Sequence, residues 1–217
     1  MKIFIGYDSE HPEAYEVCKA SILKHNPLHE VHPLINKKLR KKGLYDRPKH
    51  LMESTEFSFT RFLVPLLCNY TGRALYCDGD FLWRCDPQEL THHMNDEDVA
   101  VVKHPKFSIK TKKMKNKGNA DYDMKYWSSL MFFDCAKCDS LTKWYVSNAH
   151  AAHLHGFSWA EKIGSIPASF NALVGYYDFG KKYTKAAHFT DGGPWLEGYE
   201  NVEFADEWFQ IKSEISQ

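Results

Sequence analysis

Two aspartates separated by one glycine follow directly on an apolar segment of this 217-residue chain. The apolar residues Ala74–Cys77 lead into Asp78, Gly79 and Asp80, and the chain is apolar again from Phe81. Two carboxylates beside a hydrophobic strand are costly unless a cation or hydrogen bonds compensate them. Hard cations such as Mg²⁺ or Mn²⁺ prefer oxygen ligands and often share them with substrate phosphates. The triplet therefore indicates either a divalent-cation site or a turn with two solvated acids.

A second group of residues with possible chemistry lies near the end of the chain. His188 belongs to the segment Ala186–Phe189, which we predict as a strand, and Gly192 and Gly193 follow it. A histidine at a strand end can supply a nitrogen ligand to the same cation, although such a residue is more often structural. The glycines would let backbone amides approach a phosphate.

The overall composition is that of a folded globular chain, with 43% hydrophobic and 15% aromatic residues. Lysine plus arginine and aspartate plus glutamate each number 28, which argues against nucleic-acid binding because that usually requires a basic excess. No apolar run approaches the roughly 18 residues of a membrane-spanning helix, and Met1–Gly6 is too short for a signal peptide. We therefore expect a cytoplasmic protein with six reduced cysteines. The sequence does not indicate its oligomeric state.

The first part of the chain shows the order strand, helix, strand. Lys2–Gly6 is a short apolar run, and a helix follows with Pro12 in its first turn and Asp8 or Ser9 as its expected cap. Glu30–Ile35 is the second predicted strand. This order favours a parallel sheet with helices on its faces, which is the α/β class. The predicted buried stripe of the helix comprises Ala14, Val17, Cys18, Ser21 and Ile22.

The rest of the chain continues this alternation, with two segments, 37–56 and 105–123, that we expect to be irregular. The remaining predicted elements are a helical segment at 59–67, strands at Arg73–Cys77, Val99–Lys103 and Tyr126–Phe133, a helix at Ser140–His155, a short helix within Ser165–Val174, a strand at Ala186–Phe189, and a helix at about Glu203–Ile215.

Taken in order, the motifs resemble those of GT-A nucleotide-sugar glycosyltransferases, especially the glycogenin-like and bacterial galactosyltransferase-like group, and small viral glycosyltransferases. The resemblance implies one GT-A, Rossmann-like α/β domain over 1–217, with a mixed, mainly parallel sheet, a nucleotide-binding half (about 1–104) and an acceptor-side half (about 105–217). The motifs that carry the resemblance are Ile3–Asp8, Arg61–Pro65, Ala74–Trp83, Trp127–Phe133, Ile166–Asn171 and His188–Trp195.

The same resemblance implies an activity and a ligand set. The chain would move a hexosyl or deoxyhexosyl group from a nucleotide sugar, most simply a UDP-sugar, to a hydroxyl of a glycan or other acceptor. We favour retention of configuration, as in the most similar group. Asp78, Asp80 and His188 would bind Mn²⁺ or Mg²⁺. The donor nucleotide would contact Tyr7, Asp8, Arg61, Asp78, Gly79, Asp80, Gly192 and Gly193.

One departure from the family pattern concerns the diphosphate. The family often has lysine directly before the Pro-Trp pair, where this chain has Gly193. Either backbone amides suffice for the phosphates, or a lysine from the basic loop 110–117 substitutes. We expect this loop to close over the anionic donor as a lid.

Glycosyl transfer also needs a polar group beside the sugar, because its anomeric carbon becomes oxocarbenium-like. The family often carries an acidic or amide residue where this chain has Glu161, which is our first candidate for a catalytic residue. Asp134 and Asp123 are further candidates. The structural alternative for Glu161 is a glutamate at a helix start.

Two other classes of function stay open from the sequence. The chain could bind a nucleotide sugar or carbohydrate without turnover, or it could be a nucleotidyltransferase or phosphohydrolase that uses the paired aspartates. Cys135 and Cys138 have CxxC spacing, but a zinc site needs two further ligands. We interpret His150, His153 and His155 as a surface cluster near a helix end.

Overall fold

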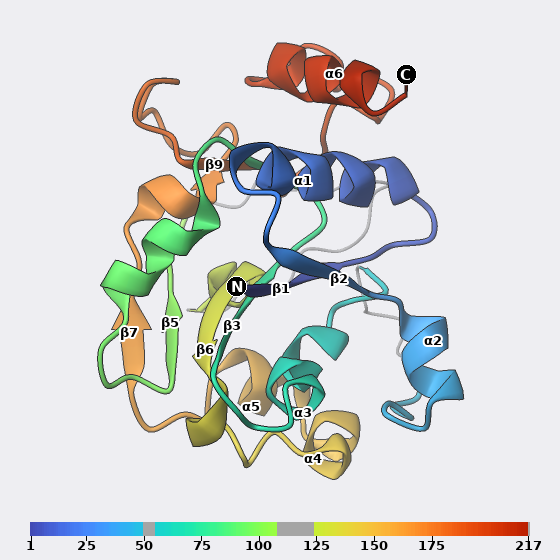
Figure 1. Cartoon of the computed structure of the whole chain (residues 1–217), viewed down its shortest axis with the longest axis vertical. Coiled ribbons are helices and arrows are strands. Elements are labelled where there is room, and N and C mark those ends of the chain that lie inside the picture. The colour runs from blue at the N-terminus through green and yellow to red at the C-terminus, as the bar shows by residue number, and fades with distance from the viewer. Residues whose placement is uncertain (50–54, 108–123, 217) are drawn as a thin grey trace.

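A six-stranded sheet with the strand order β2-β1-β3-β6-β5-β7 forms the centre of the protein. The computed structural model describes residues 1–49, 55–107 and 124–216 (Figure 1). Only β6 runs antiparallel to its neighbours, β3 and β5, while the other pairs are parallel. The predicted mixed, mainly parallel α/β sheet is therefore confirmed. The strands are β1 (Lys2–Gly6), β2 (Glu30–Leu34), β3 (Arg73–Cys77), β5 (Val99–Val101), β6 (Leu130–Asp134) and β7 (Ile163–Ser165).

A second, three-stranded sheet, in the order β4-β9-β8, lies beyond the carboxyl end of β3. Its strands are β4 (Phe81–Trp83), β9 (Ala186–His188) and β8 (Ala172–Leu173). The chain passes from β3 through the two aspartates into β4, and β4 pairs antiparallel with β9. This pairing brings the end of β9 back to the aspartates, although the two segments are about a hundred residues apart in sequence.

Helices cover both faces of the central sheet. Figure 1 shows α1 and then α6 stacked on one face, and α3, α4 and α5 on the other. Short 3-10 turns connect several elements; those nearest the site are Thr60–Leu63, Trp127–Ser129 and Ala168–Asn171. None of the helices in the described part of the chain is long and apolar enough to cross a membrane. The helices are α1 (Pro12–His25), α2 (Asn36–Lys41), α3 (Val64–Leu67), α4 (Lys143–Asn148), α5 (Ala151–His155) and α6 (Ala205–Glu214).

The strands of the central sheet are buried on both faces because successive side chains point to opposite sides. On β1, Ile3 and Ile5 pack in the core beneath α1, whereas Phe4 packs in the core beneath α3, α4 and α5. On β3, Leu75 packs in the core beneath α1, and Tyr76 packs in the core beneath α3, α4 and α5. Cores on both faces hold the carboxyl ends of β1 and β3 in fixed positions beside each other.

Helix α1 has the predicted buried stripe but not the predicted cap. Its N-cap is His11, and no side chain caps it. Asp8 is used in the turn before the helix, where its carboxylate accepts from Glu10 N at 3.0 Å, and Ser9 Oγ bonds to Glu56. The buried residues of α1 are Ala14, Tyr15, Val17, Cys18, Ser21 and Ile22.

Two predicted elements differ from the structure for local reasons. The predicted helix at 140–155 is two helices, α4 and α5, because Ala149 and His150 adopt extended backbone angles. The predicted strand at 126–133 begins only at Leu130, since Tyr126 has a left-handed φ of 70° that starts a 3-10 turn. A positive φ at a non-glycine residue is uncommon and interrupts a strand.

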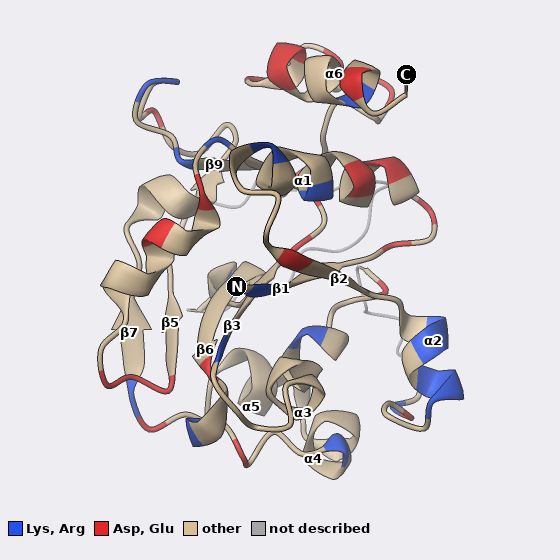
Figure 2. Cartoon of the chain, in the orientation of Figure 1, with Lys and Arg blue, Asp and Glu red and all other residues tan. Residues whose placement is uncertain are grey.

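The segment 37–56, which we expected to be irregular, contains part of helix α2. Its basic residues point to solvent and Leu39 alone is buried. Figure 2 shows this lysine- and arginine-rich helix at the periphery of the fold. The basic run is thus a solvated helix face.

Candidate metal and nucleotide site

Asp78, Asp80 and His188 meet at the carboxyl end of β3. One ligand atom from each of them lies within 4.8 Å of the other two. His188 Nε2 is 3.3 Å from Asp80 Oδ1. Within the residues that the structure describes, this is the one such group of three or more histidine, cysteine, aspartate or glutamate side chains. We call these three residues the triad. Two carboxylates and an imidazole are a donor set suited to a divalent cation.

The turn that carries the aspartates depends on a close backbone approach. A Cβ atom on Gly79 would lie 2.4 Å from Gly6 O, at the end of β1. Only glycine fits there without displacing one of the two backbone segments. The carbonyl of Asp80 accepts from Phe189 N at 3.0 Å, which ties the turn to the end of β9.

Asp78 is a buried carboxylate with two strong partners. Its Oδ1 accepts from Tyr76 Oη at 2.5 Å and lies 3.1 Å from Arg61 Nη2. Burial raises the pKa of Asp78, and the nearby Arg61 guanidinium acts in the opposite direction. Arg61 comes from the 3-10 turn before α3 and also donates to Ser128 O at 2.9 Å. These contacts make Arg61 the counter-charge of Asp78.

His188 is held on its ring face and at its second nitrogen. Its ring stacks on Phe81, the residue opposite it on β4, with 4.4 Å between the centroids. Nδ1 is 2.8 Å from Asn171 Oδ1. Asn171 is fully buried and was not among the predicted site residues. It belongs to a motif that carried the family resemblance, but its spacing along the chain gives no sign of this contact.

A cleft opens beside the triad, between the loop after β1 and the turn after β3. The predicted residues Asp8, Gly79 and Asp80 line it, whereas Tyr7 is not among the lining residues. The Tyr7 ring instead packs edge-on against Tyr15, with 5.5 Å between centroids. The full lining is Gly6, Asp8, His11, Ala14, Tyr15, Thr55, Phe57, Gly79, Asp80 and Trp195.

The two glycines after β9 have a packing role beside this cleft. Gly192 has a φ of 138°, and a Cβ there would lie 2.7 Å from the Tyr199 ring. A Cβ on Gly193 would lie 2.1 Å from the ring of Trp195, which lines the cleft. Both positions need glycine for the loop to fold over its own aromatic residues. Their contact with a diphosphate stays a prediction.

No protein-family model matches the chain. A comparison with curated proteins gives a clear relative, Protein CDI of Arabidopsis thaliana, which is 40% identical over 225 residues and is matched by 99% of this chain and 87% of its own length. The chain belongs to the CDI family. This relationship covers both the central sheet and the segments that supply the triad.

Solved structures place the CDI-family chain in a fold class. GlyE from Streptococcus pneumoniae TIGR4 matches 97% of it with a TM-score of 0.66 and 12% identity. The bifunctional glycosyltransferase WbbM matches 98% with a TM-score of 0.66 and 14% identity. The galactosyltransferase LgtC, solved with donor and acceptor sugar analogues, matches 99% with a TM-score of 0.61 and 11% identity. The CDI-family chain therefore has the GT-A glycosyltransferase fold. It spans 59% of the GlyE chain, 49% of WbbM and 96% of LgtC.

The predicted catalytic residues do not lie with the triad. Asp134 on β6 lies opposite Arg73, the first residue of β3, in the strand register. Glu161 is an exposed residue that precedes β7. Since β7 runs in the same direction as β3, both carboxylates lie at the amino-end edge of the sheet. The triad lies at the other edge, about 16 Å away for five residues at about 3.3 Å each. This corrects the assignment of Glu161 and Asp134, because neither can contact a sugar at the triad.

The third catalytic candidate, Asp123, lies outside the described residues, as does the basic stretch 110–117 that we expected to act as a lid. A carboxylate that the sequence analysis did not select, Asp191, lies three residues after His188. Tyr176 Oη donates to its Oδ2 at 2.7 Å, and its Oδ1 is buried without a hydrogen-bond partner in the described structure.

A buried histidine lies further along the same sheet edge. His104 follows β5, and its Nδ1 is 2.9 Å from Tyr177 Oη. Burial lowers the pKa of His104 to about 3, and the nearby His188 acts in the same direction. The imidazole is therefore neutral at pH 7.

The cysteines with CxxC spacing are buried thiols at the amino-end edge. Cys138 Sγ donates to Asp98 O at 3.3 Å, and Cys135 is fully buried. In the described part of the chain neither cysteine belongs to a group of three or more potential metal ligands. Their contacts are those of core residues.

Proposed function

We propose that this CDI-family chain is a metal-dependent glycosyltransferase that moves a sugar from a UDP-sugar to a hydroxyl of a glycan or other acceptor. The observation that carries the proposal is the triad at the side of a cleft that reaches the loop after β1. In open α/β sheets, ligands bind at the carboxyl ends of the strands, which is where this cleft lies. The fold shared with GlyE, WbbM and LgtC supports the same conclusion.

The triad fits a divalent cation in its chemistry. Asp78 Oδ1 is already engaged by Tyr76 and Arg61, and Asp80 and His188 face each other at 3.3 Å. We assign Mn²⁺ or Mg²⁺ to these residues, because two carboxylate oxygens and one nitrogen suit such ions. When bound, the ion would act as a Lewis acid that stabilises the charge on a diphosphate leaving group.

The cleft has the lining of a small-molecule site, aromatic surface with a few polar groups. Tyr15 and Phe57 offer aromatic surface for a base, and Asp8 and His11 offer polar groups at its edge. Gly79 lines the cleft and stays our candidate for a backbone contact with the ribose, and we keep Gly192 and Gly193 as candidates for diphosphate contacts. Tyr7 is replaced by Tyr15 in this assignment.

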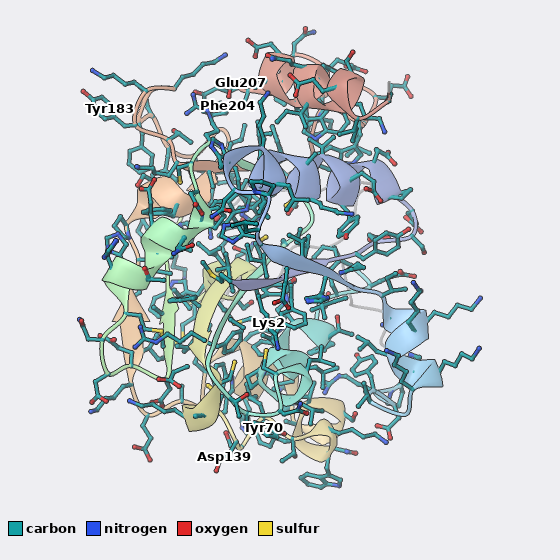
Figure 3. The ribbon with its side chains drawn as sticks, in the orientation of Figure 1. Lys2, Tyr70, Asp139, Tyr183, Phe204 and Glu207 are labelled. Carbon is teal, nitrogen blue, oxygen red and sulfur yellow. The ribbon has the colours of Figure 1, made fainter. Side chains whose placement is uncertain are left out.

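The experiment that tests the proposal is UDP binding by calorimetry with Mn²⁺ and with a chelator. We expect tight binding that needs both the metal and Asp80, so that Asp80→Asn loses it. Asp139→Asn is the matched control, because Asp139 is exposed and lies at the far end of the molecule, near Tyr70 (Figure 3). Equal UDP binding by wild type and Asp80→Asn would contradict the proposal.

Turnover separates the remaining alternatives. A panel of UDP-sugars with glycan acceptors should release UDP, and NMR of the product would show whether the anomeric configuration is retained, as we propose. Release of a nucleoside monophosphate or pyrophosphate would favour a nucleotidyltransferase or phosphohydrolase. Metal-dependent UDP binding with no turnover of any donor would favour a binding module.

A further inference from the structure

A chain of four groups connects the backbone near β6 to the triad. Tyr126 O, Ser129 Oγ, the Asn171 amide and the His188 ring follow one another at hydrogen-bond distance. We propose that Ser129 and Asn171 are positioning residues that fix His188 in the tautomer with its proton on Nδ1, so that the Nε2 lone pair faces Asp80 and the metal. The inference rests on the proposed function, since it assigns the residues that prepare the metal site.

The direction of the first hydrogen bond is set by the backbone. Tyr126 O is a carbonyl and can only accept, so the Ser129 hydroxyl, 2.6 Å away, donates its single hydrogen to it. The left-handed φ of Tyr126 turns this carbonyl toward Ser129, whose backbone N donates to it as well, at 3.1 Å. Ser129 Oγ is left with lone pairs alone.

The next two bonds follow from the first. Asn171 Nδ2 lies 2.9 Å from Ser129 Oγ and donates to it, because that oxygen has no hydrogen left to give. The amide oxygen of Asn171 therefore points to His188, at 2.8 Å from Nδ1. An amide oxygen accepts, so Nδ1 of His188 carries the proton.

The consequence for the triad concerns the other nitrogen. In the neutral ring Nε2 then has a lone pair, and it lies 3.3 Å from the carboxylate oxygen of Asp80. Two acceptors that face each other at this distance form a site for a cation. The ring cannot turn away, because His188 is 1% exposed and stacks on Phe81. Metal-ligating histidines usually have their second nitrogen fixed by a hydrogen bond in this way.

Variants of Asn171 separate positioning from simple packing. Asn171→Ala removes the acceptor at Nδ1 and should weaken Mn²⁺ binding about 10- to 100-fold by calorimetry. Asn171→Asp keeps an acceptor for Nδ1 but loses the donor to Ser129 Oγ, so it should bind Mn²⁺ more weakly than wild type and more tightly than Asn171→Ala. Ser129→Ala leaves the amide free to turn over and should cause a smaller loss than Asn171→Ala. Ser147→Ala, a buried serine on α4, is the matched control.

The decisive readout needs neither metal nor activity. Long-range ¹H–¹⁵N NMR of the metal-free protein at pH 8 should show His188 protonated on Nδ1 in wild type and Asn171→Asp, and a mixture of tautomers in Asn171→Ala. His188 protonated on Nε2 in wild type would overturn the inference, as would unchanged tautomer and Mn²⁺ affinity in both Asn171→Ala and Ser129→Ala. A wild type with the expected tautomer that binds no divalent ion would overturn the proposed function and leave the tautomer assignment intact.

Discussion

Arg61 and Asp78 form a buried ion pair at the carboxyl end of β3, with 3.1 Å between Arg61 Nη2 and Asp78 Oδ1. The two residues are 6% and 8% exposed. Buried ion pairs add little net stability over apolar residues, but breaking one leaves an uncompensated charge. Asp78 is thus held in place beside its counter-charge before any cation arrives, which is the first requirement for a preformed metal site.

Arg61→Met should destabilise the protein by about 3–5 kcal/mol in urea unfolding, because it leaves the Asp78 carboxylate buried without its counter-charge. The double variant Arg61→Met with Asp78→Asn should lose less than Arg61→Met alone. Lys24→Met provides the exposed comparison, since Lys24 pairs with Glu214 on the surface and should cost under about 1 kcal/mol. A loss in the double variant equal to the sum of the losses in Arg61→Met and Asp78→Asn would show that the charge pairing carries no coupling.

Stability should also depend on pH through His104. Its pKa is about 3 in the folded protein, against an ordinary value of 6.5. Below about pH 6.5, His104 binds a proton in the unfolded chain but stays neutral in the folded protein. The free energy of unfolding therefore falls as the pH falls from 6.5 toward 3. From pH 7 to about pH 4.5, wild type should lose about 3 kcal/mol more than His104→Asn in urea unfolding.

His153→Asn is the control for this pH series, because His153 is exposed on α5. It should keep the pH dependence of the wild type. The same pH dependence in wild type and His104→Asn would show that His104 accepts a proton in the folded state.

Sequence patterns predicted two central strands, β1 and β3, to the residue, whereas β4, β7 and β8 were not predicted. Lys2–Gly6 and Arg73–Cys77 have the predicted bounds, because each is an apolar run that the sheet buries on both faces. Helix α2 was missed, since its basic residues show no apolar periodicity and only Leu39 is buried. Tertiary contacts rather than local pattern decide such short helices.

The site was predictable where chemistry follows local spacing, and unpredictable where it depends on topology. The aspartate spacing and the family resemblance identified all three members of the triad. They did not identify Asn171, which contacts His188 from seventeen residues away. Glu161 was assigned from its place in the chain. That place does not reveal that β7 enters the sheet with its amino end away from the triad.

Gly79→Ala should abolish metal-dependent UDP binding and lower the thermal midpoint, because the added Cβ would lie 2.4 Å from Gly6 O. Gly6 is the last residue of β1, and Gly79 lies two residues after the end of β3. Neither backbone segment can therefore move without disturbing a strand. Gly164→Ala on β7 is the milder comparison: its nearest neighbours are the Glu97 side chain at 3.0 Å and the Ala100 Cβ atom at 3.2 Å, so a small shift would accommodate the methyl group. A Gly79→Ala variant that binds UDP as wild type does would place the nucleotide elsewhere.

Helix α6 is coupled to the triad through an apolar cluster formed with α1 and the small sheet. Trp208, on α6, is 3% exposed and belongs to the cluster that contains Ala187 and Phe189, the two neighbours of His188. The start of α6, where Figure 3 labels Phe204 and Glu207, is tied down by Arg84, whose Nε donates to Glu207 Oε2 at 2.7 Å. The apolar cluster therefore packs α6 against β9 and fixes the position of this strand.

Trp208→Ala should cost about 3–5 kcal/mol in urea unfolding, the usual loss for a large buried aromatic residue. It should also weaken Mn²⁺ binding, because β9 loses packing on both sides of His188. Phe209→Ala is the matched control on the next residue: Phe209 is 43% exposed, so its loss should stay below about 1 kcal/mol with Mn²⁺ affinity unchanged. If Trp208→Ala loses stability but binds Mn²⁺ as tightly as wild type, β9 is held by its strand pairing with β4 and not by α6.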